Sequence, residues 1–489
     1  MLISRRAVLL GGAAAATGVI PAAIGREPLS RDTLPANAPV RRLQLSAGEM
    51  EAALLGPDKP RTQGFCAYNG TPFFTLRAPQ GTRLLVDFEN RLPTPTTVHW
   101  HGIRVPYLSD GVSPLTQAPV APGARFAYNV PLPDPGFYFF HPHCDETGQV
   151  GRGLAGLLIV DDPAEAKLGF DLEHIIVVKD WRLDADGRWL PMFTDDGAST
   201  AGTFGTVRAT NGQVVPPRVE APAHGDVRLR VLVADSTRTI DFGCETQDAA
   251  IIAVDGQATT PPLSFSRLPD EIWRMGPAMR LDVHVRMPGP GEEVKVYDYR
   301  TAEPYLLTTL VAVDRGRRKT AFVPKALPPA KVPLPDMRRA RKMDFLVQTS
   351  AGATAIAPPL PADDPLAKAL IDSLCVGDRT FWAINRTSWG AGADLRLPPP
   401  LETLKDGESY VLSITNVTKH VHPMHLHGHV FRVLSSSRRK VPPYLADTVM
   451  TEPNETVDIA FRATSGDWVF HCHILEHMDA GLMGWFRVA

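Results

Sequence analysis

The sequence predicts an all-β protein built from β-sandwich domains, and three observations support this prediction. Short runs with apolar residues at alternate positions recur along the chain, as in residues 83–88, 227–233 and 410–415. Such alternation is typical of half-buried strands. Turn-forming residues separate the runs, since the chain contains 46 Pro and 39 Gly. Beyond the N-terminal segment no long amphipathic helical pattern occurs, and short strands bounded by turns are typical of sandwiches.

The size and charge of the chain limit the classes of function. At 489 residues it is long enough for about three domains, and a hydrophobic content of 44% supplies sizeable cores. The formal net charge of −2 gives no general electrostatic attraction to nucleic acid or to an anionic membrane. We therefore expect neither a nucleic-acid partner nor stable insertion into a membrane.

Residues 1–30 are interpreted as an export signal. Arg5 and Arg6 precede an apolar stretch, residues 7–24. This pattern is typical of the twin-arginine address of bacterial exported proteins. The alternative is a membrane anchor, which the glycines and the proline inside the stretch disfavour. We expect the twin-arginine export machinery as a partner during targeting, and a periplasmic or secreted protein.

Two joints divide the rest of the chain into three expected domains. Residues 161–166 are polar and follow an apolar strand, and residues 324–335 are rich in proline. The expected domains are residues 38–162, 163–335 and 336–489. The middle one contains only isolated histidines, which are usually surface or satisfied core residues. We interpret it as a spacer without metal that helps the other two to dock.

Eight of the fifteen histidines fall into four His-x-His triplets. The histidines are His99 and His101, His141 and His143, His425 and His427, and His471 and His473. Residues i and i+2 of a strand share a face, so each triplet offers two neighbouring imidazoles to a metal. Eight imidazoles exceed what a four-coordinate structural zinc site takes. They suit a cluster of ions assembled where the two ends of the chain meet.

The last triplet holds a cysteine between its histidines. Because strand residues alternate between faces, Cys472 points away from His471 and His473. A thiolate with two imidazoles in a near-trigonal arrangement is the ligand set of a blue-copper electron-transfer site. His422 and His477 are the histidines that can complete this set. Cys472 would then connect such a site to the cluster through a few covalent bonds.

The other four cysteines are Cys66, Cys144, Cys244 and Cys375. An exported protein reaches an oxidising compartment, in which disulfides are stable. The odd total of five leaves at least one thiol unpaired. We expect Cys472 to be that thiol, and the other four leave three pairings, or none, open.

These segments together resemble the four copper motifs of the three-domain multicopper oxidases, the laccase family. The motifs are His99-Trp-His-Gly102, His141-Pro-His143, His422-Pro-Met-His-Leu-His-Gly-His429 and His471-Cys-His-Ile-Leu-Glu-His477. The resemblance extends to residues 228–233, 253–256, 447–449 and 466–468, and so covers nearly the whole mature chain. It implies three cupredoxin-like Greek-key β-sandwich domains, with a trinuclear copper cluster between the first and the third.

The resemblance also implies four copper ions and a role for each ligand. The type 1 copper would be held by His422, Cys472 and His477. The type 2 copper would be held by His99 and His425. The type 3 pair would be held by His101, His141, His143, His427, His471 and His473.

Two further positions concern the supply of protons. Asp110 lies where relatives carry an acidic residue thought to feed protons to the cluster. The alternative is a turn aspartate, since Asp110-Gly111 is a turn signal. Several bacterial relatives have a second acid directly after the last type 1 histidine, where this chain has Met478. Glu476 and Asp479 are weak substitutes for it.

The weak axial ligand of the type 1 copper also departs from the pattern of many bacterial relatives. They have Met ten residues after the cysteine, and this chain has Leu482. Leucine donates no charge to Cu(II), so we expect a non-ligating Leu482 and a comparatively high reduction potential. The alternative is a shift of one residue that lets Met483 coordinate.

The implied activity is that of an oxidase. It would take four single electrons from a reducing substrate, a phenol or an aromatic amine, and reduce O2 to two waters. We expect the electrons to enter near an exposed edge of the type 1 site, by way of His477 or His422.

Three alternatives stay open. A metallo-oxidase of Cu(I), Fe(II) or Mn(II) has the same ligands, although the 12 Met form no cluster suited to Cu(I). A non-catalytic structural or cell-division protein on the same fold should lack ligands, whereas all eleven are present. A simple electron carrier needs only the mononuclear site, and the eight triplet histidines argue against this alternative.

Overall fold

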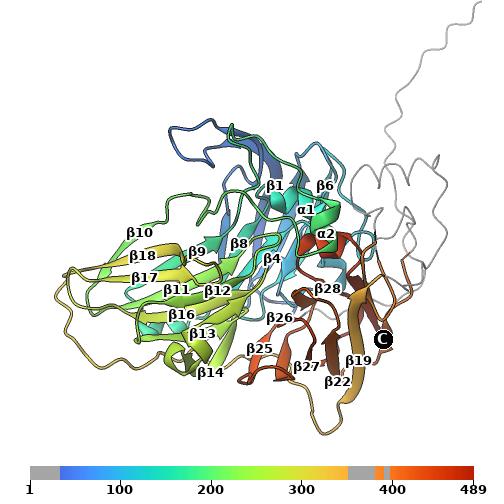
Figure 1. Cartoon of the computed structure of the whole chain (residues 1–489). Coiled ribbons are helices and arrows are strands. Elements are labelled where there is room, and N and C mark those ends of the chain that lie inside the picture. Colours follow the sequence, from blue (N-terminus) through green and yellow to red (C-terminus); the bar gives the residue numbers. More distant parts are fainter. Residues whose placement is uncertain (1–32, 351–379, 390–396) are drawn as a thin grey trace, which may run out of the picture.

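The structure is a computed structural model that describes residues 33–350, 380–389 and 397–489. The expected export signal and Cys375 lie outside the described residues. Strands dominate the molecule, and Figure 1 shows them in blue, green-yellow and orange-red groups that follow one another along the sequence. No helix in the described part of the chain is long and apolar enough to cross a membrane.

The first two sheets come from residues 40–161. One has the strand order β2-β1-β4-β6, and its strands are β1 Val40–Ala52, β2 Thr62–Tyr68, β4 Arg83–Asn90 and β6 Arg125–Pro131. The other has the order β3-β8-β7-β5, and its strands are β3 Thr75–Pro79, β5 His99–His101, β7 Gly136–His141 and β8 Gly156–Asp161. As the alternation in the sequence predicts, β4 buries Leu84, Val86 and Phe88 in the core between the sheets.

The next two sheets come from residues 172–313. One has the order β14-β13-β16-β11-β9, and its strands are β9 Leu172–Val178, β11 Asp226–Val233, β13 Ala249–Val254, β14 Gln257–Ser264 and β16 Arg280–Arg286. The other has the order β10-β18-β17-β12-β15, and its strands are β10 Arg218–Pro222, β12 Ile240–Cys244, β15 Trp273–Met275, β17 Glu293–Asp298 and β18 Tyr305–Val313. Apolar side chains from both sheets pack into one core with those of the last sandwich.

The last two sheets come from residues 341–488. One has the order β20-β19-β22-β27-β24-β25, and its strands are β19 Arg341–Thr349, β20 Trp382–Ile384, β22 Ser409–Asn416, β24 Phe431–Ser436, β25 Tyr444–Ala446 and β27 Glu455–Arg462. The other has the order β21-β29-β28-β23-β26, and its strands are β21 Glu402–Leu404, β23 His422–Leu426, β26 Thr448–Thr451, β28 Gly466–Cys472 and β29 Met483–Val488.

The predicted fold class is confirmed. The six sheets form three cupredoxin-like sandwiches of the Greek-key kind, in which sheet neighbours are often not consecutive in sequence. For example, β1 lies between β2 and β4 and runs parallel to β4.

The helices are short and lie between strands. The α-helices are α1 Glu146–Gly151, α2 Asp195–Ser199 and α4 Leu475–Asp479, and the 3-10 helices are η1 Tyr107–Ser109, η2 Glu165–Leu168, η3 Phe265–Arg267 and η4 Pro269–Glu271. Among the described residues one α-helix comes from each sandwich, and α4 contacts both α1 and α2. Figure 1 shows α1 and α2 beside the red C-terminal segment, where the three sandwiches meet.

Candidate metal centre

Strand pairing places the triplets opposite each other within each sandwich. In the first sandwich β5 pairs with β7, and His99 lies directly opposite His141. In the last sandwich β23 pairs with β28, and His425 lies opposite His471. Strand pairing within each of these two sandwiches therefore brings together two triplets that are far apart in sequence.

The two halves of the site then pack face to face. The rings of His99 and His427 stack with centroids 3.9 Å apart, and those of His101 and His425 stack at 3.8 Å. All eight triplet histidines, called here the histidine cluster, are at most 4% exposed. The expectation that both ends of the chain share one cage of imidazoles matches this arrangement.

The histidine cluster contains three groups of three histidines whose possible ligand atoms lie within 4.8 Å of one another, and His101 belongs to two of these groups. The groups are His101 with His141 and His473, His143 with His427 and His471, and His99 with His101 and His425. Each group draws on both the first and the last sandwich. None of them can form unless the two sandwiches dock.

The hydrogen bonds of the imidazoles show that the cluster suits metal ions. The Nδ1 atoms of His99, His141 and His425 bond to backbone carbonyl oxygens at 2.8 to 2.9 Å. A carbonyl only accepts, so in each neutral ring Nδ1 carries the proton and Nε2 is left with its lone pair. These three Nε2 atoms are buried and have no hydrogen-bond partner. A buried unpartnered acceptor is costly, and a metal ion would satisfy it.

The electrostatics also favour uncharged, ligand-ready rings. Burial, and then repulsion from neighbouring imidazoles, holds the pKa values of His101, His141, His425 and His427 well below the usual range. Neutral imidazole is the form that binds metal.

Three buried carboxylates stand behind the imidazoles. Asp110 Oδ2 lies 2.8 Å from His427 Nδ1, and Asp447 Oδ1 lies 3.0 Å from His101 Nε2. Glu146 Oε1 lies 2.8 Å from His143 Nδ1. Carboxylates in this position orient a ligand histidine and raise its basicity.

A glycine places one of these carboxylates. Gly111 has φ +81, and a Cβ there would collide with the carbonyl oxygen of Val98. The tight turn Asp110-Gly111 therefore lies against the strand of the first triplet. Asp110 also ends η1, so it belongs to the turn and contacts the cluster at the same time.

The cysteine site, defined by His422, Cys472 and His477, lies on the other face of β28. Cys472 Sγ is 3.5 Å from His422 Nδ1 and 3.8 Å from His477 Nδ1, and the two nitrogens are 3.1 Å apart. Metal–ligand bonds of about 2.0 to 2.3 Å in a trigonal plane place donor atoms about 3.5 Å apart. The three donor atoms therefore have the spacing of a single ion.

Hydrogen bonds set the tautomers of this site too. His477 Nε2 donates to the carbonyl oxygen of Thr200 at 2.9 Å. His422 Nε2 is 2.9 Å from the hydroxyl of Thr418, which has its own acceptor in Asn416 Oδ1 at 2.7 Å. Both rings thus carry their proton on Nε2 and aim an unprotonated Nδ1 at the sulfur.

The expectation of an exposed edge at this site is wrong. His422 and His477 are both fully buried. The reason is tertiary: residues 194–203 of the middle sandwich lie over His477, and Trp382 packs on both rings, with centroids 5.0 and 4.7 Å away.

Leu482 and Met483 lie on different faces of the last sheet. Leu482 packs in the same apolar core as Cys472 and donates its backbone N–H to the carbonyl of His477 at 2.8 Å. Met483 pairs with His471 across the sheet and packs in a separate cluster that includes Met478. Leu482 is therefore on the side of the cysteine site, and Met483 is not.

The two acids considered as substitutes for an acid at position 478 have other partners. Glu476 accepts hydrogen bonds from Thr194 and Thr203. Asp479 accepts a bond of 2.5 Å from the hydroxyl of Thr147 on α1. Burial, and then the nearby Glu146, raises the pKa of Asp479 to about 8.

Sequence reasoning missed three residues around the cluster. Glu146 lies three positions after His143, and this spacing brings side chains together on a helical turn. The spacing could therefore have identified Glu146 from the sequence. Asp447 opens a segment already noted for its resemblance. Arg280, which pairs with Asp447 at 2.6 Å, carried no signal because it comes from the middle sandwich.

Cys472 is a free cysteine, as expected, and the structure also describes three of the other four cysteines. Cys66, Cys244 and Cys472 are free, and Cys144 is disulfide-bonded. Burial raises the pKa of the thiols of Cys66 and Cys244 to about 12, so both stay protonated and unreactive.

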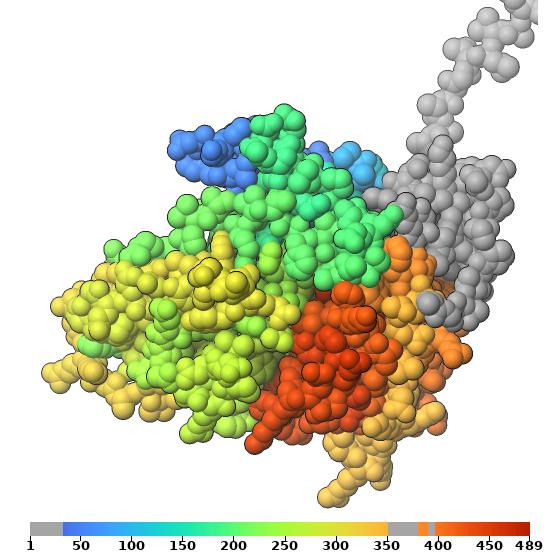
Figure 2. Space-filling model, viewed as in Figure 1, coloured from blue at the N-terminus to red at the C-terminus, as the bar shows by residue number. Residues whose placement is uncertain are grey.

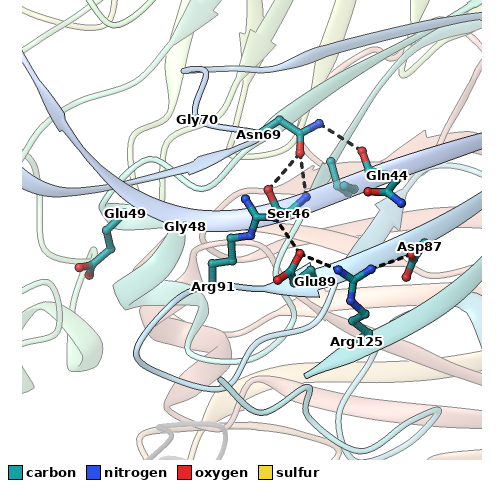
Figure 3. A pocket seen from close by; sticks show the side chains of 11 residues that line it. Gln44, Ser46, Gly48, Glu49, Asn69, Gly70, Asp87, Glu89, Arg91 and Arg125 are labelled. Atoms are coloured by element: carbon teal, nitrogen blue, oxygen red, sulfur yellow. Dashed lines mark hydrogen bonds and ion pairs between the residues drawn. The ribbon is translucent and has the colours of Figure 1, made fainter. Parts of the chain in front are cut away.

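A large pocket on the surface lies away from the metal centre. Figure 3 shows this pocket of about 480 Å³, lined by residues of the first sandwich such as Ser46, Asn69 and Arg125. Exposed ion pairs cross it, for example Arg125 with Asp87 at 2.9 Å. None of its lining residues belongs to the histidine cluster or to the cysteine site.

The chain matches known proteins along most of its length. Family models described as multicopper oxidase match residues 50–165 and 375–489. A crystal structure of a multi-copper oxidase from Pseudomonas thermotolerans is 32% identical, has a TM-score of 0.78, and is aligned over 92% of this chain and 100% of that chain. The multicopper oxidase MmcO of Mycobacterium tuberculosis is 28% identical over 96% of this chain and 90% of its own length. Laccase-2 of Fomitopsis schrenkii is 27% identical over 80% of this chain and 79% of its own length. With the fold and the histidine geometry, these matches show that the chain belongs to the multicopper oxidase family.

Proposed function

We propose that the protein is a laccase-like oxidase that removes single electrons from phenols or aromatic amines and reduces O2 to two waters. The observation that carries this proposal is the set of buried imidazole nitrogens without a partner, in three groups shared by the first and last sandwiches. Four copper ions held by the histidine cluster and the cysteine site would supply one-electron transfer and the reduction of O2.

The ligand sets that we propose follow the groups seen in the structure. The type 1 set is His422, Cys472 and His477. The type 2 set is His99 and His425. The type 3 sets are His101, His141 and His473 for one ion, and His143, His427 and His471 for the other. Support for this division comes from the spacing of the donor atoms within each set.

Residues of the chain then have distinct tasks. Cys472 lies between His471 and His473 in one strand, so a few covalent bonds connect the two sites. We assign proton supply to Asp110, whose Oδ2 accepts from His427 Nδ1 at the edge of the cluster. Asp447 and Glu146 orient the rings that they contact.

We also propose the three domains 38–162, 163–335 and 336–489. Every strand pairing in the six sheets falls within one of these ranges, which supports the two joints. Residues 1–30 are proposed to direct the chain through the twin-arginine machinery to the periplasm or outside the cell.

A metallo-oxidase of Cu(I), Fe(II) or Mn(II) is the second candidate. The burial of His477 favours this second candidate. A phenol would need an exposed imidazole on which its ring could stack, whereas a small metal ion would not. The unpartnered nitrogens argue against a non-catalytic protein, since a fold without metal gains nothing from burying them.

The proposal is tested by copper content and O2 uptake. We expect about four copper ions per molecule, an intense blue colour, and O2 consumption that depends on copper and on an added phenol. Cys472→Ser should lose the colour and the activity, and Cys244→Ser, which removes a free thiol elsewhere, should keep both. A copper-loaded wild type that is colourless, or that consumes O2 only with metal ions, would contradict the laccase-like reading.

A further inference from the structure

Residues 194–203, called here the capping loop, leave the middle sandwich and lie over the cysteine site. The helix α2 forms its centre and contacts α4, which carries His477. Figure 2 shows green atoms of the middle sandwich against the red C-terminal segment. The loop therefore lies against the helix that carries His477, on the side of the Nε2 atom of that ring.

One carboxylate holds both ends of the capping loop. Glu476 Oε1 accepts from the backbone N–H of Thr194 at 3.0 Å and from the hydroxyl of Thr203 at 2.6 Å. Glu476 Oε2 accepts from the backbone N–H of Thr203. The hydroxyls of Thr194 and Thr203 are 2.6 Å apart. A surface loop whose ends meet in this way is an Ω-loop, a kind of loop that is frequently functional.

The middle of the loop is tied to the site itself. The carbonyl of Thr200 accepts from His477 Nε2 at 2.9 Å, and the carbonyl of Ala198 accepts from Trp382 Nε1 at 2.5 Å. Gly197 and Ala198 face inward and are buried, whereas Asp195 and Asp196 face solvent. The imidazole of His477 is thus covered, and its outer nitrogen is occupied by a backbone carbonyl.

From this geometry we propose that the capping loop determines which donors the enzyme oxidises, an inference that rests on the proposed function. With the loop in place no aromatic ring can stack on His477, so each electron crosses the Thr200 carbonyl and its hydrogen bond to His477 Nε2. Small donors, namely single-ring phenols or metal ions, approach the thin loop closely. Bulky donors with two or more rings gain from direct contact with the imidazole and are the ones that the loop disfavours.

The ends of the loop allow a direct test. Because Thr194 and Thr203 touch, residues 195–202 can be replaced by Gly-Gly without separating the flanking chain. We expect kcat/KM for a two-ring phenolic azine such as syringaldazine to rise about tenfold, while that for 2,6-dimethoxyphenol changes by less than about threefold. An equal change for both donors, or no change for either, would overturn the proposal.

A milder pair of variants covers the case in which the excised protein fails to fold. Thr203→Val removes the hydroxyl that contacts Glu476 and Thr194. Thr206→Val removes a hydroxyl of the same segment that bonds only to backbone groups of residues 181 and 183. Thr203→Val should shift the preference toward the bulky donor, and Thr206→Val should not. An equal shift of the donor preference in both variants would contradict the role given to the hydrogen bonds between Glu476 and the ends of the loop.

Chemical modification reports on the loop without any activity. Copper bound at Nδ1 would leave His477 Nε2 protonated and unreactive, so this test uses protein from which copper has been removed with a chelator. In that protein diethyl pyrocarbonate should modify the partly exposed His224 but not His477, as located by peptide mass spectrometry. The loop-excised protein should be modified at His477 as well. Modification of His477 in the wild type at the rate of His224 would show that the loop does not cover it. A copper-loaded wild type that oxidises no donor at all would instead refute the proposed function, and this modification pattern would still decide whether the loop caps the site.

Discussion

Arg280 of the middle sandwich and Asp447 of the last form a fully buried bidentate ion pair, with N–O distances of 2.9 and 2.6 Å. Asp447 also contacts His101 of the first sandwich. One pair of side chains therefore connects all three sandwiches beside the histidine cluster. The middle sandwich thus contributes to the site in two ways, through Arg280 and through the capping loop.

Removal of the arginine should destabilise the protein strongly. In Arg280→Leu the Asp447 carboxylate stays buried without its partner, which costs about 3–5 kcal/mol. Chemical denaturation of wild type and variant measures the difference. Arg77→Leu is the control, because its pair with Asp161 is exposed and should contribute about 1 kcal/mol or less. Equal losses in the two variants would contradict the role assigned to Arg280.

The axial position should tune the potential of the cysteine site. Leu482→Met brings a thioether to the face of Cys472, which stabilises Cu(II), so the reduction potential should fall by about 59 mV or more, a tenfold change for a one-electron couple. Met483→Leu should leave the potential unchanged, since Met483 lies on the opposite face. A redox titration in which Met483→Leu moves the potential would show that Met483 coordinates.

Glu146 should matter for copper binding. Glu146→Leu removes the carboxyl oxygen that lies 2.8 Å from His143 Nδ1, and the loss of such a neighbour typically weakens metal binding about 10–100-fold. Competition with a copper chelator measures this. Glu146→Gln keeps an acceptor oxygen and should restore most of the affinity. Wild-type affinity in Glu146→Leu would rule out the orienting role.

Asp226 should give a specific dependence of stability on pH. Burial would raise its pKa, but hydrogen bonds from Arg286, His284 and Lys325 prevail and lower it from 3.8 to about 2. A carboxyl with a lowered pKa stabilises the fold fully above pH 3.8, and this contribution is lost as the pH falls toward 2. The difference in unfolding free energy between wild type and Asp226→Asn should therefore shrink over that interval. A constant difference between pH 5 and pH 2 would contradict the assignment.

Much of the fold and of the metal centre could be predicted from local patterns. The alternation in residues 83–88 predicts a half-buried strand because a strand repeats every two residues, and β4 occupies residues 83–90. The same period places Cys472 and its neighbouring histidines on opposite faces of β28. The domain joints and the role of Asp110 stay predictions.

Other features depend on contacts between residues far apart in sequence. Arg280 has its role because β16 begins beside Asp447, which lies 167 residues later in the chain. The exposed edge expected at His477 was wrong because a segment almost 280 residues earlier in the chain covers that ring.

What the sequence determined by itself is the set of possible ligands and the faces on which they lie, since strand geometry and imidazole chemistry act over a few residues. Only the tertiary structure decided how the imidazoles divide into groups, which carboxylates orient them, and what covers His477. Those outcomes follow from the docking of three sandwiches, and the position of one buried surface against another is not encoded in any short stretch of the chain.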